Sequence, residues 1–375
     1  MYSKRSNFVP IAVLIFAIFA ADRVNAQSGR VQATPSPTPD ETIRVVTEEI
    51  KLNVLAFDEQ GNFFGDVTAR DLVITEDNIL HQPTSVRRIP ANILIVMDTG
   101  GEMRSVKSLD WTRRVAKSLV RSLKADDTVA IMQYSDKPEI VDEWTSNKAQ
   151  SLDAIAKKTY FGRRSAFVDA LKMATDFMLR DPIENRHLVL ITDGTDSLGQ
   201  SSAKFDAFRR LMTTDISVHV LSYTSMEGAD IAPRTSVISN SPPPNAMPDM
   251  VRDQLPNDVK IAASRPKIGS TINLDRTLNK KIKARKADLE SSQEQLEKLT
   301  ENTNGEFILP DSTDEMVEKA PLVAKMIDSS YVVTYTPKLS VVETRGVAER
   351  SIEVTSKRQG LIVQARRKLV ISKVN

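Results

Sequence analysis

Two stretches decide the fold of this chain: ILIVMDTGGEM at residues 93–103 and HLVLITDGTD at residues 187–196. Each is a continuous run of apolar residues that ends in an acidic, glycine-containing turn. Such runs are typical of strands that are buried on both faces of a parallel sheet. Ligands of open α/β sheets bind at the carboxyl ends of the strands, where these turns place Asp98 and Asp193. Oxygen-rich loops at that edge suit a hard cation such as Mg²⁺.

The centre of the chain, residues 91–328, alternates predicted strands with predicted helices. Apolar runs predict strands at 93–97, 129–134, 188–191, 216–222 and 307–309, with an antiparallel strand at 140–144. Helical spacing of apolar residues predicts helices at 106–123, 166–179, 202–212 and 316–327. This alternation predicts a doubly wound, mostly parallel sheet with helices on both faces.

Residues 224–271 lack a regular pattern, so we expect an irregular insert there, followed by a long helix at 275–301. In that helix Ile282, Leu289 and Leu296 fall at heptad spacing, while Arg285 and Ser292 interrupt the apolar seam. Coiled-coil pairing with another chain is one interpretation. The interruptions favour the other, in which the helix packs on its own domain.

Two β-like segments, 41–90 and 329–375, flank the α/β centre. The second contains predicted strands at 331–335, 351–355 and 361–370. Each segment alone would leave strand edges open, so we expect the two to pair. The predicted fold class is therefore α/β: a doubly wound, mostly parallel sheet, inserted in or flanked by a small antiparallel β-sandwich built from the N- and C-terminal segments.

The N-terminal residues 1–26 have the pattern of a secretory signal peptide, with Lys4 and Arg5 before a short apolar run and cleavage after Ala26. The run is short for a membrane span, so we expect no membrane insertion after cleavage; an uncleaved anchor is the alternative. Residues 27–40 form a predicted disordered linker rich in Pro, Ser and Thr. The expected location is periplasmic or secreted.

The composition excludes several classes of function. The net charge of the 375 residues is only +2, so bulk charge indicates no nucleic-acid partner. The chain has no cysteine, which excludes disulfides, thiol catalysis and thiolate metal sites. His81, His187 and His219 are scattered, and two of them flank predicted buried strands, which indicates packing rather than metal binding.

The strand that ends in Asp98, the helix after it and the later Asp193-Gly194 turn together resemble the von Willebrand factor type A domain, over residues 91–327. This family binds a divalent cation through a metal-ion-dependent adhesion site. The flanking stretches FDEQG, DLVITED and YVVTYTP at residues 57–61, 71–77 and 331–337 resemble the bacterial exported proteins related to this family. In those proteins, β segments surround such a domain.

The resemblance implies that Asp98, Glu102, Ser165 and Asp193 hold Mg²⁺ or Mn²⁺. The family's first motif is Asp-x-Ser-x-Ser, but here Gly100 and Glu102 stand in place of the two serines. Ser165 stands where the family has Thr, and Asp193 matches the third motif. One hydroxyl ligand is therefore missing, and a carboxylate has been added.

Two hypotheses about this site remain open. In one, the four residues bind the cation together with waters. In the other, Arg163 or Arg164 neutralises Glu102 in a bidentate pair, and the site is vestigial and metal-free.

Enzymatic motifs are weak in this sequence. Asp98-Thr99-Gly100 resembles an aspartic-protease turn, but that chemistry needs two carboxylates and no second Asp-Thr-Gly exists. Ser201 and Lys204 match a Ser-x-x-Lys pattern without its Lys-Thr-Gly partner. We therefore predict a protein that is not an enzyme.

Two functions are compatible with these observations. The first is an exported, adhesion-type module that binds a protein partner through the top face of the type A domain and its degenerate metal site. The alternative is a structural protein of an envelope assembly, which has a vestigial, metal-free site and acts through the 224–271 insert and the long helix.

Overall fold

The computed structural model describes residues 49–101, 108–199, 201–235, 238–239, 271–272, 276–339 and 347–372. All of them belong to one compact unit, residues 47–375. The predicted signal peptide, the linker, Glu102 and most of the predicted insert lie outside the described residues. Among the described helices, none is both long and apolar enough to cross a bilayer.

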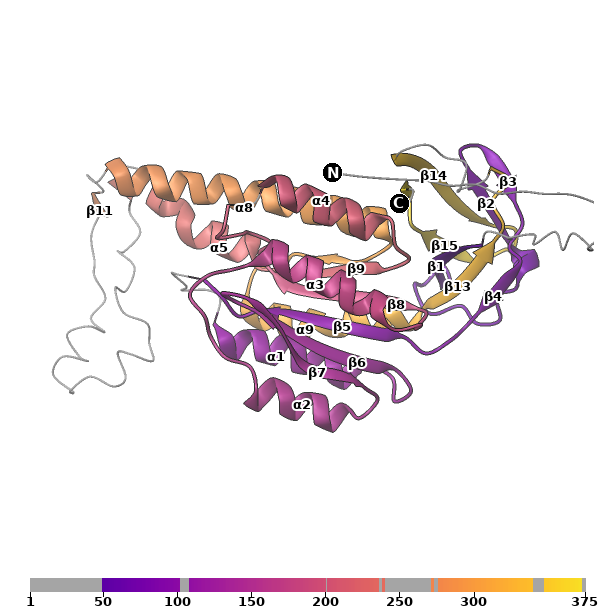
Figure 1. Ribbon diagram of the computed structural model, residues 1–375, viewed down its shortest axis with the longest axis horizontal. Coiled ribbons are helices and arrows are strands. Elements are labelled where there is room, and N and C mark those ends of the chain that lie inside the picture. The colour runs from indigo at the N-terminus through magenta and orange to yellow at the C-terminus, as the bar shows by residue number, and fades with distance from the viewer. Residues whose placement is uncertain are drawn as a thin grey trace, which may run out of the picture. The chain divides into compact units, whose positions relative to one another are not determined.

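The central sheet has six strands in the order β12-β9-β8-β5-β6-β7 (Figure 1). These strands are β5 (Asn92–Asp98), β6 (Thr128–Tyr134), β7 (Pro138–Thr145), β8 (Arg186–Thr192), β9 (Ser217–Ser222) and β12 (Phe307–Ile308). All neighbours are parallel except β6 and β7, which are antiparallel. The predicted doubly wound, mostly parallel sheet is therefore confirmed, including its antiparallel edge strand.

Helices cover both faces of this sheet (Figure 1). On one face lie α1 (Leu109–Ser122), α2 (Lys148–Lys157) and α9 (Thr313–Asp328), and on the other lie α3 (Phe167–Arg180), α4 (Ser201–Met212) and α8 (Arg276–Thr303). Strand β5 shows why both faces need covering. Its Ile93 and Ile95 pack toward α1, its Leu94 and Val96 toward α3, and none of the four is more than 1% exposed.

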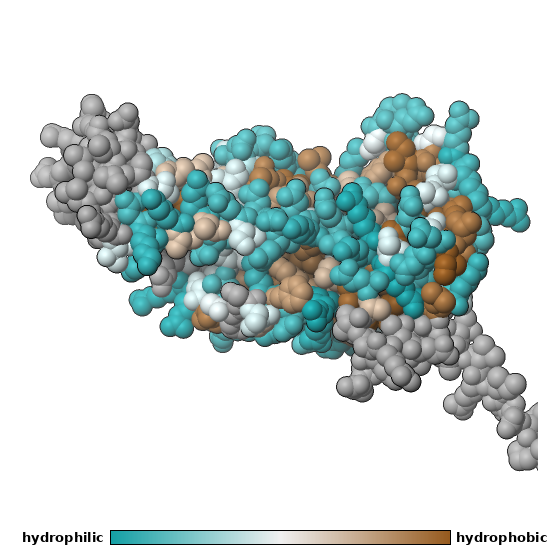
Figure 2. Space-filling view, turned by 90° about the horizontal axis from the view of Figure 1, so that it is seen from above, coloured by the Kyte–Doolittle hydropathy of each residue, from teal (hydrophilic) through white to brown (hydrophobic). Residues whose placement is uncertain are grey.

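The long helix α8 packs on its own domain. Leu289, Leu296 and Leu299 are all buried, and the last two belong to the same core cluster as α3. Figure 2 looks onto α4 and α8 and shows a surface over these helices in which hydrophilic residues predominate. The apolar seam noted in the sequence therefore faces the interior of this domain, as the second interpretation of that helix predicted.

The flanking β segments form two four-stranded antiparallel sheets with one shared core. Their orders are β15-β1-β13-β4 and β16-β14-β2-β3. The strands are β1 (Ile50–Phe57), β2 (Leu72–Glu76), β3 (Ile79–His81), β4 (Ser85–Arg87), β13 (Ser330–Tyr335), β14 (Val347–Ser356), β15 (Ile362–Ala365) and β16 (Lys368–Ser372). Each sheet combines strands from both ends of the chain, as the predicted pairing requires.

Three predictions about single elements were wrong. The insert was expected to be irregular from residue 224, but Thr224–Ile231 forms helix α5, which packs against α8 and continues into a short 3-10 helix, Ala232–Thr235. The single strand predicted at 361–370 is two strands, β15 and β16, in different sheets. Helix α2 was not predicted.

Two small features complete the fold: a 3-10 turn at Ala69–Asp71 and a strand pair of β10 (Ile238–Ser239) with β11 (Thr271–Ile272).

Two buried histidines, His187 of β8 and His219 of β9, form a hydrogen-bonded chain within the central sheet. The backbone N–H of Glu306 donates to Nδ1 of His219 at 3.1 Å, so the proton of this ring lies on Nε2. That Nε2 is 3.0 Å from Nδ1 of His187, whose own Nε2 lies 3.0 Å from Oδ1 of Asn185. Both rings are therefore neutral. Burial lowers the pKa of His219 to about 3, and burial with the neighbouring ring lowers the pKa of His187 well below its usual value.

This pair makes the fold sensitive to mild acid. Below about pH 6.5 the unfolded chain takes up protons at both histidines while the folded chain does not, so stability falls as the pH falls. From about pH 7.5 to about pH 5.5 we expect a loss of about 3 kcal/mol in the free energy of unfolding, measured by urea denaturation. The variant His219→Gln removes one titrating ring and is expected to lose about half as much. Equal stability of the native chain at both pH values would contradict the assignment.

Candidate functional site

The carboxylate of Asp98 is the centre of the carboxyl edge of the sheet. It ends β5 and is fully buried. Ser165 Oγ donates to it from 3.1 Å, equidistant from its two oxygens, and Thr192 Oγ1 donates to Oδ2 at 3.3 Å. The backbone N–H of Gly100 donates to Oδ1 at 3.1 Å. Three separate segments of the chain therefore converge on one negative charge.

Tyr134 supports this arrangement from the end of β6. Its hydroxyl lies 2.6 Å from Oγ1 of Thr192, the residue that donates to Asp98. Burial, together with the charges of Asp98 and Asp193, raises the pKa of Tyr134 well above its usual value. The hydroxyl therefore keeps its proton and can donate to Thr192, which leaves the proton of Thr192 for Asp98.

Asp193 is balanced by an arginine of the long helix. Its Oδ1 accepts from the backbone N–H and the hydroxyl of Thr195 at 2.7 Å and 2.6 Å, and its Oδ2 lies 3.3 Å from Nη2 of Arg285. The same Nη2 lies 2.6 Å from Glu227 of α5. Burial works against the charge of Arg285, but Asp193 and Glu227 outweigh it and raise the pKa of Arg285. The guanidinium thus lies between two carboxylates.

Two more side chains, from α8 and α4, hydrogen-bond to the turn that contains Asp193. Ser292 follows Arg285 on the same helix, α8, and its Oγ donates to the carbonyl of Asp193 at 2.8 Å. Lys204 of α4 donates to the carbonyl of Gly194 at 2.8 Å, and burial lowers the pKa of Lys204 to about 8. Lys204, the lysine of the Ser-x-x-Lys pattern, is therefore a structural donor to this turn.

Gly100 lies where two loops approach backbone to backbone. A Cβ at this position would be 1.7 Å from the carbonyl oxygen of Arg164 and 2.8 Å from Cα of Ser135. Gly162 is similarly close, since its Cβ would lie 2.3 Å from Oγ of Ser135. The space for a side chain at Gly100, where the family motif has a serine, is filled by the backbone of the neighbouring loop.

The structure brings only part of the predicted ligand set together. Asp98 and Ser165 are in direct contact. Asp193 follows Thr192, the second hydroxyl on Asp98, but its own carboxylate is hydrogen-bonded to Thr195 and Arg285. Glu102 lies outside the described residues, so its pairing with Arg163 or Arg164 stays a prediction. Asp196, a further carboxylate of the turn after β8, accepts from the backbone N–H of Val168 at the start of α3, at 2.9 Å.

The described residues fit a divalent cation poorly. No cluster of three or more Asp, Glu, His or Cys groups suited to a metal occurs in the described part of the chain. Beside Asp98 lie the hydroxyls of Ser165 and Thr192, and the second carboxylate, that of Asp193, already has Arg285 as its counter-charge. Hard cations prefer several oxygen ligands and no neighbouring cation. Arg285 forms an arginine–carboxylate pair with Asp193, which is distinct from the pair predicted between Glu102 and Arg163 or Arg164.

The sequence contained a signal for the two residues of α8 that reach Asp193. Arg285 and Ser292 are the polar residues that interrupt the apolar seam of this helix. In the structure, both interruptions face the Asp193 turn and hydrogen-bond to it. Polar residues within a buried stripe need partners, so this break in the pattern marks the contact.

Comparison with known proteins supports the type A fold. The family model described as von Willebrand factor type A domain matches residues 93–195, which confirms the resemblance for that stretch. It includes Asp98, Ser165 and Asp193. No curated protein sequence matches the chain.

Several solved structures are similar in part. Conserved hypothetical protein BatB from Bacteroides thetaiotaomicron is 16% identical, with a TM-score of 0.37 over 63% of this chain and 98% of that one. A von Willebrand factor type A protein from Catenulispora acidiphila is 10% identical, with a TM-score of 0.41 over 88% and 74%. Manganese-loaded TRAP protein from Plasmodium vivax is 13% identical, with a TM-score of 0.35 over 79% and 98%. With TM-scores this low, we take no function from these neighbours.

The close approach at Gly100 predicts a strong effect of a single methyl group. Gly100→Ala is expected to lower the free energy of unfolding by about 2 kcal/mol or more, because the backbone of Arg164 must move. Gly228→Ala in α5 is the matched control, since its Cβ meets nothing within 4 Å, and it is expected to be neutral or stabilising by about 0.5 kcal/mol. Denaturant unfolding of both variants measures the difference; similar values for the two would show that the loops are not in contact.

Removal of Arg285 separates the two hypotheses about the site. Arg285→Gln leaves the buried carboxylate of Asp193 without its counter-charge and is expected to lower stability by about 2 kcal/mol, whereas Lys286→Gln, whose ion pair with Glu290 is exposed, should change little. Millimolar Mn²⁺ or EDTA is expected to leave the melting temperature of the native chain unchanged. A rise with Mn²⁺ that disappears in Asp98→Ala would instead establish a working metal site.

Proposed function

We propose that this chain is an exported, non-enzymatic module that binds a protein partner through the loops at the carboxyl edge of its type A domain. The proposal of export rests on the signal-peptide pattern of residues 1–26. An exported chain would be periplasmic or secreted. The binding role rests on the surface that surrounds the Asp98 site.

The observation that carries the proposal is the composition and exposure of residues 160–164, which we name the rim loop. Tyr160 and Phe161 are 45% and 53% exposed. Arg163 and Arg164 are exposed beside them, and the carboxylate of Asp136 accepts from the backbone N–H of Arg164 at 3.2 Å. Tyrosine, phenylalanine and arginine are the residue types enriched in protein interfaces and their energetic centres. The rim loop thus has the chemistry of a docking surface.

The rim loop is held firmly from below. The backbone N–H of Gly162 donates to the carbonyl of Thr99 at 3.1 Å, and that of Tyr160 donates to Oε1 of Gln133 at 3.0 Å. Ser165, at the end of the loop, donates to Asp98. A preorganised loop loses little conformational entropy on binding, which favours affinity.

The charge of the rim loop indicates an acidic partner. A guanidinium forms bidentate hydrogen bonds with a carboxylate, and the two exposed arginines lie near the buried Asp98 site. We propose that they receive the partner's carboxylate, in place of the open coordination position of a metal ion. In this scheme the degenerate metal site contributes rigidity rather than a ligand.

The alternative, an envelope assembly protein that acts through the insert and the long helix, has less support. Leu289, Leu296 and Leu299 of α8 are buried on their own domain. Most of the insert lies outside the described residues. The exposed aromatic and basic rim loop therefore favours the first function.

The proposal is tested by capture of a partner with the chain from Gln27 onward. Extracts of the producing cell and of its culture medium are passed over the immobilised native chain and over the double variant Arg163→Glu/Arg164→Glu. The amount of each captured protein is then compared between the two. We expect at least about a tenfold loss of the partner in the double variant and no effect of EDTA. The control is Lys280→Glu/Lys281→Glu, which reverses two exposed charges on α8. If both double variants capture the same proteins as the native chain, the rim loop is not the binding surface.

A further inference from the structure

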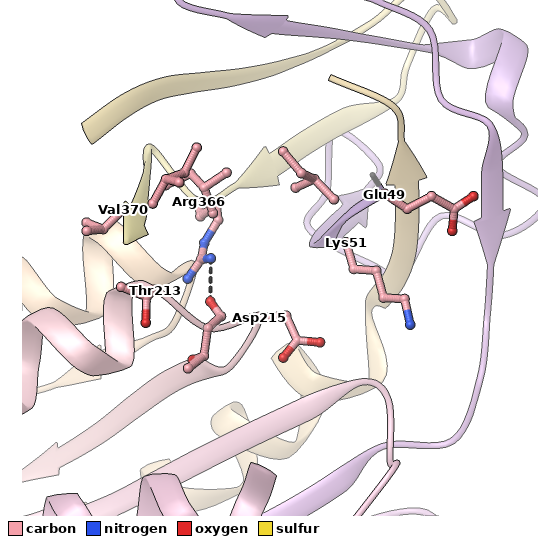
Figure 3. A pocket seen from close by; sticks show the side chains of 10 residues that line it. Glu49, Lys51, Thr213, Asp215, Arg366 and Val370 are labelled. Atoms are coloured by element: carbon pink, nitrogen blue, oxygen red, sulfur yellow. Dashed lines mark hydrogen bonds between the residues drawn. The ribbon is translucent and has the colours of Figure 1, made fainter. Parts of the chain in front are cut away.

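A pocket of about 350 Å³ lies where the β-sandwich meets the α/β part of the chain (Figure 3). Its turn of residues 213–215 precedes β9, so the pocket lies at the edge of the central sheet opposite to Asp98. One wall is the start of β1, a second is strand β16, and the third is the turn of residues 213–215 between α4 and β9. Its apolar lining comes from Ile50, Leu369, Val370 and Ile371. The volume is at the small end of the range for ligand pockets, about 300–1,000 Å³.

Arg366 extends into this space from the corner between β15 and β16 (Figure 3). The residue is only 3% exposed, and its Nη1 donates to the carbonyl of Thr214 at 2.5 Å. Its Nη2 is buried and has no hydrogen-bond partner among the described residues. Burial lowers the pKa of Arg366 to about 10, which still leaves the guanidinium charged at neutral pH. A buried charge with an unsatisfied donor is costly unless a partner is bound.

Two other charged groups of the pocket, Asp215 and Lys51, have ion-pair partners. Both oxygens of Asp215 lie 2.8 Å from Nη1 of Arg186, and Nζ of Lys51 lies 2.5 Å from Glu184. Within the described residues, no carboxylate forms an ion pair with Arg366. The pocket therefore combines an apolar wall with a buried guanidinium that feels the charge of Asp215 but has an unsatisfied donor at Nη2.

We propose that this pocket binds a small organic acid, whose carboxylate pairs with the guanidinium of Arg366 while its apolar chain packs on Ile50, Leu369 and Ile371. A singly charged carboxylate fits better than a phosphate dianion, because Glu49 and Asp215 add negative charge to the same walls. The site is separate from the rim loop, so it would carry a second ligand independently of the protein partner.

The test uses the chain from Gln27 onward and three probes: sodium hexanoate, its neutral analogue hexanamide, and inorganic phosphate. Calorimetric titration and thermal unfolding report binding, since a ligand of the folded state raises the melting temperature. We expect hexanoate to bind at millimolar concentration or below, and hexanamide at least about tenfold more weakly, because it lacks the charge that Arg366 recognises.

The variant Arg366→Met removes the charge at similar volume and should abolish hexanoate binding, while Arg367→Met, an exposed neighbour, should bind as the native chain does. Thr213→Trp narrows the pocket from its opposite wall and should also abolish binding, so the test does not depend on the folding of one variant. No response to hexanoate, equal binding of hexanamide, binding of phosphate alone, or unchanged binding in both pocket variants would each overturn the proposal.

Discussion

The buried negative charge of Asp98 is the constraint on which the functional edge of this protein depends. A carboxylate with no exposure must be met by donors, and here they come from the turn after β5, from Ser165 and from Thr192, 67 and 94 residues away in sequence. These contacts draw the loops so close that Gly100 has no room for a side chain. The exposed rim loop is therefore carried by a base that cannot easily deform.

Much of the fold could be predicted from the sequence because burial leaves a periodic trace. Strands covered on both faces, such as β5 and β8, are continuous apolar runs, and the helices around them show helical spacing. One helix and one strand boundary leave no such trace. Helix α5 lacks an apolar period and is held by its contact with α8. Strands β15 and β16 bury residues in one shared core, so their pattern continues across Arg366 although the chain changes sheet there.

The site could be predicted in part for a geometric reason. Parallel strands end at one edge, so Asp98 and the residues after β8 had to be neighbours. Sequence reasoning could not place the counter-charge of Asp193, because Arg285 comes from a helix 92 residues downstream whose docking is a tertiary fact. In the sequence, Arg285 was visible only as an interruption of an apolar seam. A metal site and an arginine network use the same carboxylates. They differ in the positive group that faces those carboxylates, which is a metal ion in one and a guanidinium in the other.

The pairing of the two ends of the chain also determines the order in which the protein can form. Strand β1 pairs with β13 and β15, and β2 pairs with β14 as well as with its neighbour β3. The buried ion pair of Glu76 with Arg350 joins residues 274 apart. During synthesis β1 therefore emerges with no native sheet partner, and β2 with β3 alone, until β13 and β14 have been made. The α/β centre can assemble in the meantime, and the sandwich then closes behind it. The unpaired early strands are the part of this protein that a chaperone would need to shield.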